Sequence, residues 1–339
     1  MTAPMPGNPT VVFREPRIVL LEDRDRPRPG PGQVLVRTLR SLISTGTELT
    51  ILAGEFPPGG HWALYGKFPF TAGYSNVGVI EAAGEGVESG WIGKRVASFS
   101  PHAAWVTLPT TECHPVPDGV ADEDATLFAI AMIVMNGVRL SGLTWGESVT
   151  IFGAGLLGQF AARIALLAGA RPVFVVDPAA ARLALLPKDP GVIPVNAASA
   201  DPASVVLDRT GGRRCDAVFE ITGNPSLIPK EFDCLKRPLG RFILLSSPRG
   251  ATEFDFHNLS NAISSVIIGT HLMAHPPIET PQAPWTRARN AALFFEWVKA
   301  GTFPAKFLLS HRVPAAKAPE AYAMLLADRS SAMGVVFEW

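Results

Sequence analysis

Three glycines in the spacing Gly-x-Gly-x-x-Gly carry the clearest chemical signal in this sequence: Gly153, Gly155 and Gly158. An apolar, β-rich run at 149–152 precedes them, and an apolar helical segment at 159–169 follows. In that setting the first glycine permits a tight turn from strand to helix, the second lets a pyrophosphate approach the backbone, and the third lets the helix pack against the sheet. The pattern predicts a dinucleotide-binding turn, and an α/β turn that binds nothing is the alternative.

The start of the next helix and the end of the next strand supply further cofactor contacts. Backbone amides at the helix start, at Leu156 and Leu157, offer unpaired donors and a partial positive charge to phosphates. A second predicted strand ends in Asp177, whose carboxylate would accept hydrogen bonds from ribose hydroxyls and repel a 2′-phosphate. The sequence therefore favours NAD, although Arg182 lies close enough along the chain to leave NADP as an alternative.

Small and polar residues follow three further predicted strands, at 217–221, 241–245 and 265–268. In an open parallel sheet, ligands bind beyond the carboxyl ends of the strands, so we expect these residues to line the nicotinamide and its ribose. Threonine and serine in such places also serve as ordinary strand-end caps, and that alternative stays open. The residues are Thr222, Gly223, Ser246 and Gly269.

These groups need a parallel sheet to position them, and the sequence from about residue 119 predicts one. Predicted strands alternate there with predicted helices, a pattern typical of a parallel sheet with right-handed crossovers. Residues 1–118 instead contain short strand candidates separated by turns, which predict a small antiparallel barrel. In and after this region we expect strands at 18–21, 33–38, 76–82, 96–98 and 102–108, a loop at 61–70, and a helix from 122 to 141.

Composition limits the class of protein. The chain has 339 residues, of which 47% are hydrophobic and 18% charged, so it is too apolar to be disordered and long enough for two domains. Its 30 basic and 30 acidic residues cancel, which gives no electrostatic reason to expect nucleic acid or an anionic membrane as partner. The most apolar run, at 125–135, is about 11 residues long, whereas a membrane span needs about 20.

The cysteines and the first residues bear on the compartment. Cys113, Cys215 and Cys234 are too few and too scattered for a disulfide framework or a cysteine-only metal site. Residues 1–30 contain four acidic side chains and lack the apolar core of a signal peptide. We therefore expect a cytoplasmic protein.

Three further segments extend this interpretation over essentially the whole chain. They are Gly73–Ile80, Gly93–Ala97 and Val116–Val120. Together with the glycine turn near residue 150, they resemble the medium-chain dehydrogenase/reductase superfamily. The resemblance implies an α/β protein with a GroES-like β-barrel catalytic domain, at 1–118 and 271–339, and a Rossmann doubly wound parallel-sheet domain at 119–270 that binds NAD. It also implies an active site in the cleft between the two domains.

Many members of this superfamily hold a catalytic zinc, and this sequence departs from that pattern at each ligand position. The cysteine ligand corresponds to Thr45, and the histidine and glutamate positions hold Tyr74 and Ser75. The third ligand would fall near Ala129, which has no donor atom. Because zinc needs thiolate, imidazole or carboxylate ligands, we predict that none is bound. The four-cysteine loop that holds a structural zinc in the family is missing as well.

Without zinc, hydroxyl groups are expected to handle the substrate oxygen and its proton. Tyr74 is the first candidate for the acid or base, and a tyrosine packed between strands is the alternative. Thr47 matches the hydroxyl that relays protons in the family, with a cap on the helix begun by Glu48 as the alternative. Ser75 is a weaker relay candidate, and Thr45 is the hydroxyl in place of the cysteine ligand.

His102 precedes a strand that faces the cleft in family members. An imidazole titrates near neutral pH, so this residue is a further candidate acid or base, and a histidine exposed on a turn is the alternative. Glu48 stands where the family usually has aspartate, and we expect a structural ion pair there.

Together these features predict a zinc-independent, NAD-dependent oxidoreductase that interconverts a secondary alcohol and a ketone by hydride transfer. The chain looks most similar to the polyol, threonine and bacteriochlorophyllide dehydrogenase branch, which implies a sugar, a cyclitol or a ring-containing natural product as substrate. Aromatic side chains at 61–70 either wall such a ring or pack in the barrel. The alternatives are an NADPH-dependent enoyl or quinone reductase and a non-catalytic NAD-binding protein. An apolar edge strand at 264–269 predicts a homodimer.

Overall fold

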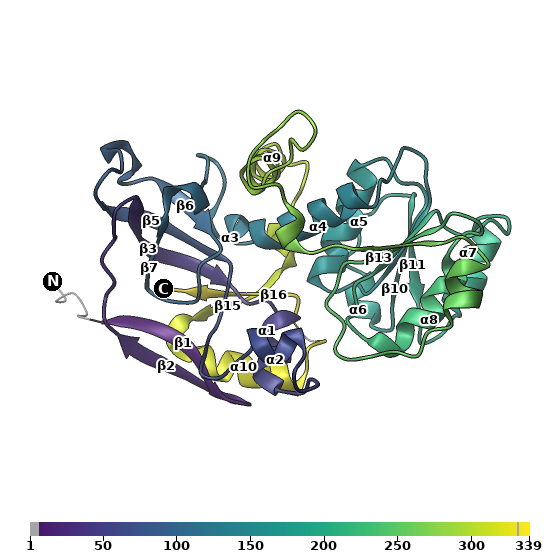
Figure 1. The fold of residues 1–339 in the computed structure, drawn as a ribbon, viewed down its shortest axis with the longest axis horizontal. Helices are drawn as coiled ribbons and strands as arrows, with labels where there is room; N and C mark the ends of the chain where they lie inside the picture. The colour runs from purple at the N-terminus through teal and green to yellow at the C-terminus, as the bar shows by residue number, and fades with distance from the viewer. Residues whose placement is uncertain (1–6, 331) are drawn as a thin grey trace. The chain divides into compact units, whose positions relative to one another are not determined.

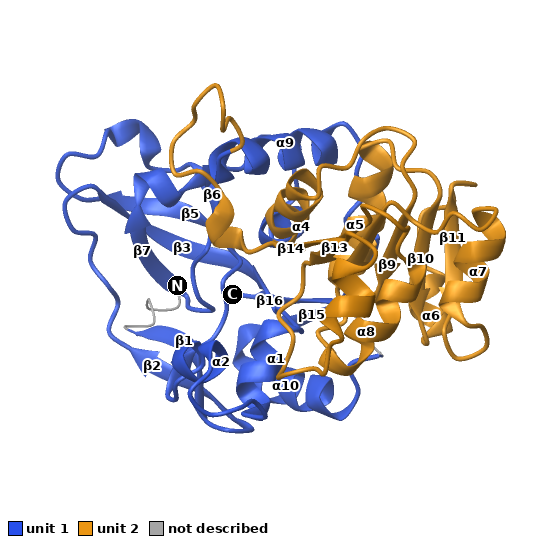
Figure 2. Cartoon of the chain, turned by 45° about the vertical axis from the view of Figure 1, so that its right-hand side comes forward, with its two compact units in different colours: residues 1–129, 286–339 blue, residues 130–285 orange. Residues whose placement is uncertain are grey.

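The computed structural model describes residues 7–330 and 332–339, and Figure 1 shows their fold. The chain forms two compact units, coloured separately in Figure 2: unit 1 comprises residues 1–129 and 286–339, and unit 2 comprises residues 130–285. The sequence places these boundaries at 118 and 270, earlier than the division at 129 and 285 that the structure gives.

The first boundary lies later because the residues that follow 118 are bonded to unit 1. Arg95 Nη1 donates to Asp122 Oδ1 at 2.7 Å, and Ser75 Oγ donates to the carbonyl of Thr126 at 2.5 Å. The partners are 27 and 51 residues apart in the chain, so no local sequence pattern indicates these contacts.

The second boundary lies later because residues 271–285 are bonded to unit 2. Asn136 Nδ2 donates to the carbonyl of His271 at 3.0 Å. The guanidinium carbon of Arg139 lies 3.3 Å from the centroid of the Trp285 ring, within reach of a cation–π interaction.

Unit 2 is built on a parallel sheet. Its strands are β9 (Val149–Phe152), β10 (Val173–Asp177), β11 (Val192–Asn196), β12 (Ala217–Glu220), β13 (Arg241–Leu244) and β14 (Val266–Gly269). They lie in the order β11-β10-β9-β12-β13-β14, and every neighbouring pair is parallel. Numbered along the chain, this is the strand order of the doubly wound Rossmann fold, so the predicted fold of this domain is confirmed.

Helices flank this sheet (Figure 1). They are α5 (Leu156–Leu167), α6 (Ala180–Leu183), α7 (Pro202–Arg209) and α8 (Ile228–Glu231). β9, β10 and β12 are buried along their whole length, as expected for β-branched and aromatic strands covered on both faces. In the core beside α7 and α8, Phe232 stacks on Phe242 with ring centroids 4.3 Å apart.

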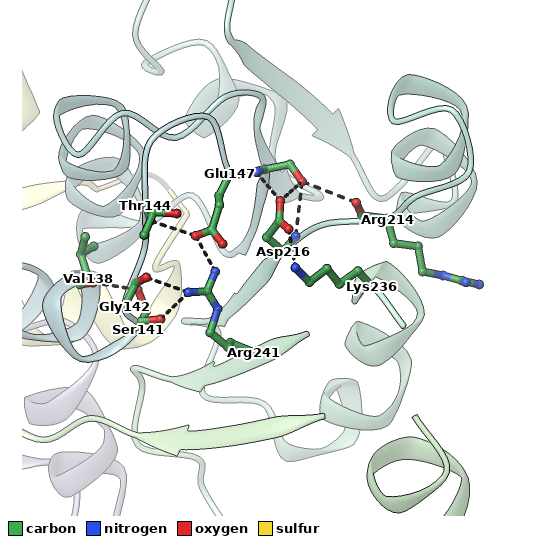
Figure 3. A network of polar contacts seen from close by, with 10 residues as sticks. Val138, Ser141, Gly142, Thr144, Glu147, Arg214, Asp216, Lys236 and Arg241 are labelled. Carbon is green, nitrogen blue, oxygen red and sulfur yellow. Dashed lines mark hydrogen bonds and ion pairs between the residues drawn. The ribbon is translucent and has the colours of Figure 1, made fainter. Parts of the chain in front are cut away.

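Charged residues are paired at the edge of this sheet where β9, β12 and β13 begin, as Figure 3 shows. Arg241 Nη2 donates to Glu147 Oε2 at 2.5 Å, and its other terminal nitrogen donates to two carbonyls of a nearby turn. Lys236 Nζ donates to Asp216 Oδ1 at 2.7 Å, while Asp216 Oδ2 accepts from the amide and the hydroxyl of Ser148. We call these five residues the amino-edge network.

Unit 1 is built mainly from strands. They are β1 (Asn8–Glu15), β2 (Ile18–Arg24), β3 (Gln33–Leu42), β4 (Phe70–Thr71), β5 (Asn76–Ala83), β6 (Arg95–Ser98), β7 (Trp105–Pro109), β8 (His114–Pro115), β15 (Leu309–Pro314) and β16 (Gly334–Glu338). A larger sheet runs β15-β16-β3-β5-β6-β8 with β7 paired to β3, and a smaller sheet runs β2-β1-β4. β16 pairs antiparallel with β3, so the tail of the chain belongs to this unit, as the resemblance implies.

Three sequence expectations for the N-terminal region are wrong in detail. β1 was not expected, because its centre at 11–13 is buried without alternation and its ends are polar. Residues 61–70, predicted as a loop, contain helix α2 (His61–Tyr65) and the start of β4. The single helix predicted from 122 to 141 is divided into α3 (Asp122–Ala125) and α4 (Phe128–Leu140).

The remaining helices of unit 1 are α1 (Thr47–Ala53), α9 (Arg287–Lys299) and α10 (Ala318–Ala327). Side chains of α1 and α10 share one apolar core with β1 and β16, in which the ring of Tyr322 meets Phe13 edge-on at 5.0 Å. This core includes Leu49, Ile51 and Leu52 of α1 and so holds that helix in place. In the part of the chain that the structure describes, no helix combines the length and the apolar character needed to cross a membrane.

Candidate functional site

The glycine turn after β9 has the geometry that the sequence predicts. Gly153 has a φ of +103°, in the left-handed region that favours glycine. A Cβ built on Gly158 would lie 1.8 Å from the carbonyl oxygen of Gly153, so only glycine lets α5 approach the strand this closely. A Cβ on Gly155 would meet no atom within 4 Å, which leaves open space beside the turn. The turn fits a pyrophosphate, with Leu156 and Leu157 as the first residues of α5.

Asp177 ends β10 and braces this turn. Its Oδ2 accepts from the amide of Ala154 at 2.8 Å, and its Oδ1 accepts from the amide of Ala179 at 2.8 Å. The side chain is only 5% exposed. Arg182 Nη1 lies 3.9 Å from Asp177 Oδ2, too far for a hydrogen bond, so the arginine is near the acid but leaves both oxygens to backbone donors.

A buried carboxylate that was not among the predicted residues lies at the end of β12. Glu220 is fully buried, and both of its oxygens accept hydrogen bonds. Oε1 accepts from the hydroxyl of Thr222 at 2.6 Å and from the amide of Gly223 at 2.8 Å, and Oε2 accepts from the hydroxyl of Ser246. The structure therefore brings three of the predicted cofactor-lining residues together around one acid. A charged residue at the end of an apolar strand, two positions before Thr222, is the signal that could have found it.

A second buried acid lies near this group. Glu231, at the end of α8, is 1% exposed, and among the described residues neither of its carboxyl oxygens has a hydrogen-bond partner. Burial, together with the charge of Glu220, raises the pKa of Glu231 to about 9. This side chain is therefore neutral at pH 7.

Gly269 ends β14 at the same edge of the sheet, paired with Leu244 of β13. A Cβ built there would meet no atom within 4 Å, so the backbone is accessible at this point. Gly269 lies one strand further from the glycine turn than the group held by Glu220.

In unit 1, Tyr74 lies among other hydroxyl groups. Its phenolic oxygen is 2.6 Å from Ser44 Oγ, and Thr47 also forms a hydrogen bond with it. Burial raises the pKa of Tyr74 to about 12, and the charge of Glu48 adds to that effect, while the bonds from Ser44 and Thr47 partly oppose it. The phenol is therefore protonated at neutral pH and suited to donate a hydrogen bond. Ser44 was not among the predicted residues.

The predicted relay residues have different surroundings. Thr47 is the first residue of α1, whose N-cap is Gly46, so the helix-cap alternative is wrong. The buried hydroxyl of Ser75 donates to the carbonyl of Thr126 at 2.5 Å, which commits its proton to the backbone. Thr45 is half-buried two residues before Thr47.

His102 is enclosed, and the alternative of an exposed turn histidine is wrong. The residue has no exposed surface; its Nε2 lies 3.1 Å from Glu48 Oε2 and its Nδ1 lies 2.8 Å from Ser41 Oγ. Glu48 Oε2 also accepts from the hydroxyl of Tyr322, and Glu48 Oε1 accepts from the amide of Ser44. The expected ion pair at Glu48 thus takes the form of a buried network that holds the start of α1.

The residues at the family's zinc positions do not fit the metal. Thr45, Tyr74 and Ser75 offer hydroxyl oxygens, and the hydroxyls of Tyr74 and Ser75 already have protein partners. Across residues 7–330 and 332–339, no three His, Cys, Asp or Glu side chains are grouped so as to hold a metal ion.

The aromatic residues near α2 are divided between core and surface. Trp62, Phe68 and Phe70 pack against the apolar core of unit 1, which favours the interpretation as barrel packing. Tyr65 remains 46% exposed, with its ring stacked on that of His61 at 6.1 Å.

Comparison with protein families gives two matches that together span residues 30–284. Residues 30–160 match the alcohol dehydrogenase GroES-like domain, and residues 157–284 match the zinc-binding dehydrogenase family. The chain therefore belongs to the medium-chain dehydrogenase/reductase superfamily, and unit 1 has the GroES-like fold that the resemblance implies.

Several proteins with sequences similar to this chain carry the names of dehydrogenases. The L-threonine 3-dehydrogenase of Pyrococcus horikoshii is 29% identical over 271 residues, covering 70% of this chain and 75% of the relative. The D-guloside 3-dehydrogenase of Escherichia coli is 22% identical over 349 residues, covering 96% and 99%. Among solved structures, an alcohol dehydrogenase from E. coli CFT073 in complex with NADH has a TM-score of 0.81 at 18% identity, covering 99% of this chain and all of that one, which establishes a shared fold.

Proposed function

We propose that this chain is a zinc-independent, NAD-dependent oxidoreductase that interconverts a secondary alcohol and a ketone. It is an alcohol-dehydrogenase-type oxidoreductase by family membership, and its relatives act on amino-acid and sugar-derived alcohols, as their names state. The observation that carries the zinc-independent part is that Tyr74, at the position of the family's histidine ligand, is hydrogen-bonded to the hydroxyls of Ser44 and Thr47.

The proposed chemistry needs a hydrogen-bond donor at the substrate oxygen. A nicotinamide cofactor, when bound, accepts or gives the hydride, so the protein has only to bind, orient and move a proton. A phenol with a pKa near 12 stays protonated at neutral pH and donates to a carbonyl oxygen, which suits ketone reduction. In the reverse direction, Ser44 and Thr47 give the alcohol proton a path along hydroxyl groups.

NAD is the proposed cofactor, because Asp177 presents a buried carboxylate beside the glycine turn. A 2′-phosphate would meet that negative charge. Arg182, 3.9 Å away, keeps NADP as the alternative.

The experiment is the substitution Tyr74→Phe. Removing the phenolic hydroxyl is expected to lower turnover of a secondary alcohol or ketone by about 10²-fold, while the NAD dissociation constant stays the same. Tyr65→Phe is the matched control, since it makes the same chemical change on an exposed side chain. Near-normal turnover of the Tyr74 variant would assign that residue to packing.

Two further measurements separate the alternatives. Metal analysis of the purified protein is expected to give far less than one zinc per chain, and a stoichiometric zinc that survives dialysis would contradict the proposal. Turnover of activated alkenes with NADPH alone would instead identify an enoyl or quinone reductase. Tight NAD binding without turnover of any substrate would identify a non-catalytic NAD-binding protein.

We also propose a cytoplasmic homodimer that pairs through β14. Val266 and Ile267 of this edge strand are 44% and 41% exposed, and an apolar strand edge invites pairing with a second copy. A molar mass of one chain in light scattering at micromolar concentration would exclude it. A sugar, cyclitol or ring-containing natural-product alcohol remains the proposed substrate class.

A further inference from the structure

The acid at the end of β12 has an unusual set of partners. Three donors converge on the Glu220 carboxylate, and all three are neutral. Among the described residues no cation lies within ion-pair distance of it. The guanidinium of Arg249 approaches the same loop, 3.8 Å from a Cβ built on Gly223, but makes no ion pair with Glu220. A buried negative charge therefore lies uncompensated at the carboxyl edge of the sheet.

The hydrogen bonds also fix the polarity of two hydroxyl groups. Thr222 and Ser246 each have one hydroxyl proton, and each donates it to Glu220. Toward a ligand, both oxygens can then act only as acceptors. They suit a ligand that brings donors, such as the carboxamide NH₂ of nicotinamide or the hydroxyls of its ribose.

The charge has a second consequence for such a ligand. The oxidised nicotinamide ring carries a positive charge, and the reduced ring is neutral. A fixed anion beside the ring attracts the oxidised form, and a low-dielectric interior makes that attraction stronger than it would be in water.

We propose that Glu220 is a positioning residue that sets the preference of unit 2 for the oxidised over the reduced cofactor, by presenting two hydroxyl acceptors and one unpaired charge to the nicotinamide half. This inference rests on the proposed function, because it requires that a nicotinamide cofactor lies along the β12–β13 edge.

Glu231 provides a matched control within the same buried region. Because its carboxyl group is neutral at pH 7, Glu231→Gln replaces an uncharged group with another of the same shape. Glu220→Gln makes the same chemical change but removes a charge. Ser246→Ala removes one acceptor and leaves the charge of Glu220 in place.

The test measures dissociation constants for NAD⁺ and NADH separately, by calorimetry or by cofactor fluorescence, without any substrate. Relative to the parent chain, Glu220→Gln is expected to shift the ratio of the two constants about tenfold toward NADH. Glu231→Gln is expected to leave the ratio unchanged, and Ser246→Ala to weaken both forms by the same factor. In the parent chain, NAD⁺ should bind about tenfold more tightly than a dinucleotide whose nicotinamide is replaced by a neutral benzamide ring.

The outcomes separate this inference from the proposed function. If the parent chain binds neither NAD⁺ nor NADH, the proposed function is wrong and this inference falls with it. If it binds both and Glu220→Gln weakens both equally, Glu220 has only a structural role. Should that variant fail to fold, equal binding of NAD⁺ and the benzamide analogue by the parent chain would overturn the inference on its own.

Discussion

Acidic side chains at the two edges of the parallel sheet in unit 2 have different hydrogen-bond partners. In the amino-edge network, Glu147 and Asp216 are bonded to the cations Arg241 and Lys236 at 2.5 and 2.7 Å (Figure 3). At the carboxyl edge, Asp177 and Glu220 are more deeply buried, yet their hydrogen bonds come from neutral amides and hydroxyls. Arg182 lies 3.9 Å from Asp177 without a hydrogen bond to it, and among the described residues Glu220 has no cation within ion-pair distance.

The difference in partners distinguishes a carboxylate that stabilises the fold from one that can act on a ligand. An acid bonded to a cation has its charge neutralised locally, so it contributes to folding and offers little to a ligand. An acid held only by neutral donors keeps its net charge, at a cost in desolvation that folding alone does not explain. Such groups cluster at functional sites, and here they lie at the edge where a Rossmann sheet binds its ligand.

The largest expected effect comes from Glu231, the buried acid near Glu220 whose carboxyl oxygens have no hydrogen-bond partner among the described residues. Its pKa rises from 4.5 to about 9 on folding, so the native state holds a proton that the unfolded state releases between these values. Stability of the parent chain must then fall as pH rises through this range. One group changes stability by at most about 1.4 kcal/mol per pH unit, so Glu231→Gln should gain on the order of 3 kcal/mol over the parent chain between pH 6 and pH 8.

Urea unfolding of both proteins at several pH values checks this prediction. Parallel stability curves for parent and variant would mean that Glu231 is solvated or paired, and the contrast between the two edges would be weaker than proposed.

The next largest effect is expected at Asp177. Asp177→Asn keeps the shape of the side chain but removes the charge that we propose faces the ribose, so NAD affinity should fall about 10- to 100-fold, as for the loss of a hydrogen bond to a charged group. NADP affinity should fall less or rise, since the repulsion of a 2′-phosphate is removed. Titrations with both cofactors measure the change in their ratio. An equal loss for both would assign Asp177 to bracing the turn at Ala154 alone.

The carboxyl edge was largely predictable from the sequence where its geometry is local. The turn at Gly153–Gly158 depends on residues adjacent in the chain, and its glycines have the conformation and contacts expected of them. Thr222 and Ser246 were expected at the edge because each follows a predicted strand. What could not be predicted is that Glu220 joins them, because the bond to Ser246 spans 26 residues and depends on how two strands align.

In the hydroxyl cluster of unit 1, even more of the contacts join residues that are far apart in the sequence, so fewer of them could be predicted. Tyr74 and Thr47 were expected from the family pattern, but their partner Ser44 and the enclosing contacts of Glu48 were not. Tyr322 reaches Glu48 across 274 residues, and His102 reaches it across 54. An imidazole beside a turn therefore looks exposed in the sequence and is buried in the structure.

The smallest effect is expected at the amino edge, where Asp216→Asn makes the same change as Asp177→Asn. Partial burial raises the pKa of Asp216, but the bonds from Lys236 and Ser148 outweigh it, so the pKa is lowered overall. An acid with a lowered pKa adds stability above its unfolded pKa, and this is lost as pH falls through the folded value. The variant should therefore be about 1 kcal/mol less stable at pH 7, in keeping with a partly exposed ion pair, and the gap should close below about pH 4.

Measuring cofactor binding by the Asp216 variant tests whether charge at the amino edge acts on the cofactor. Because Asp216 lies at the opposite edge from the glycine turn, its variant should bind NAD⁺ and NADH with the constants of the parent chain. A change in either constant would mean that charge at the amino edge also acts on the cofactor, and the division of acids into structural and ligand-directed sets would then fail. If the Asp216 variant binds both cofactor forms normally but is less stable, while Asp177→Asn changes cofactor affinity, then the structural and the ligand-directed acids lie at opposite edges of one sheet.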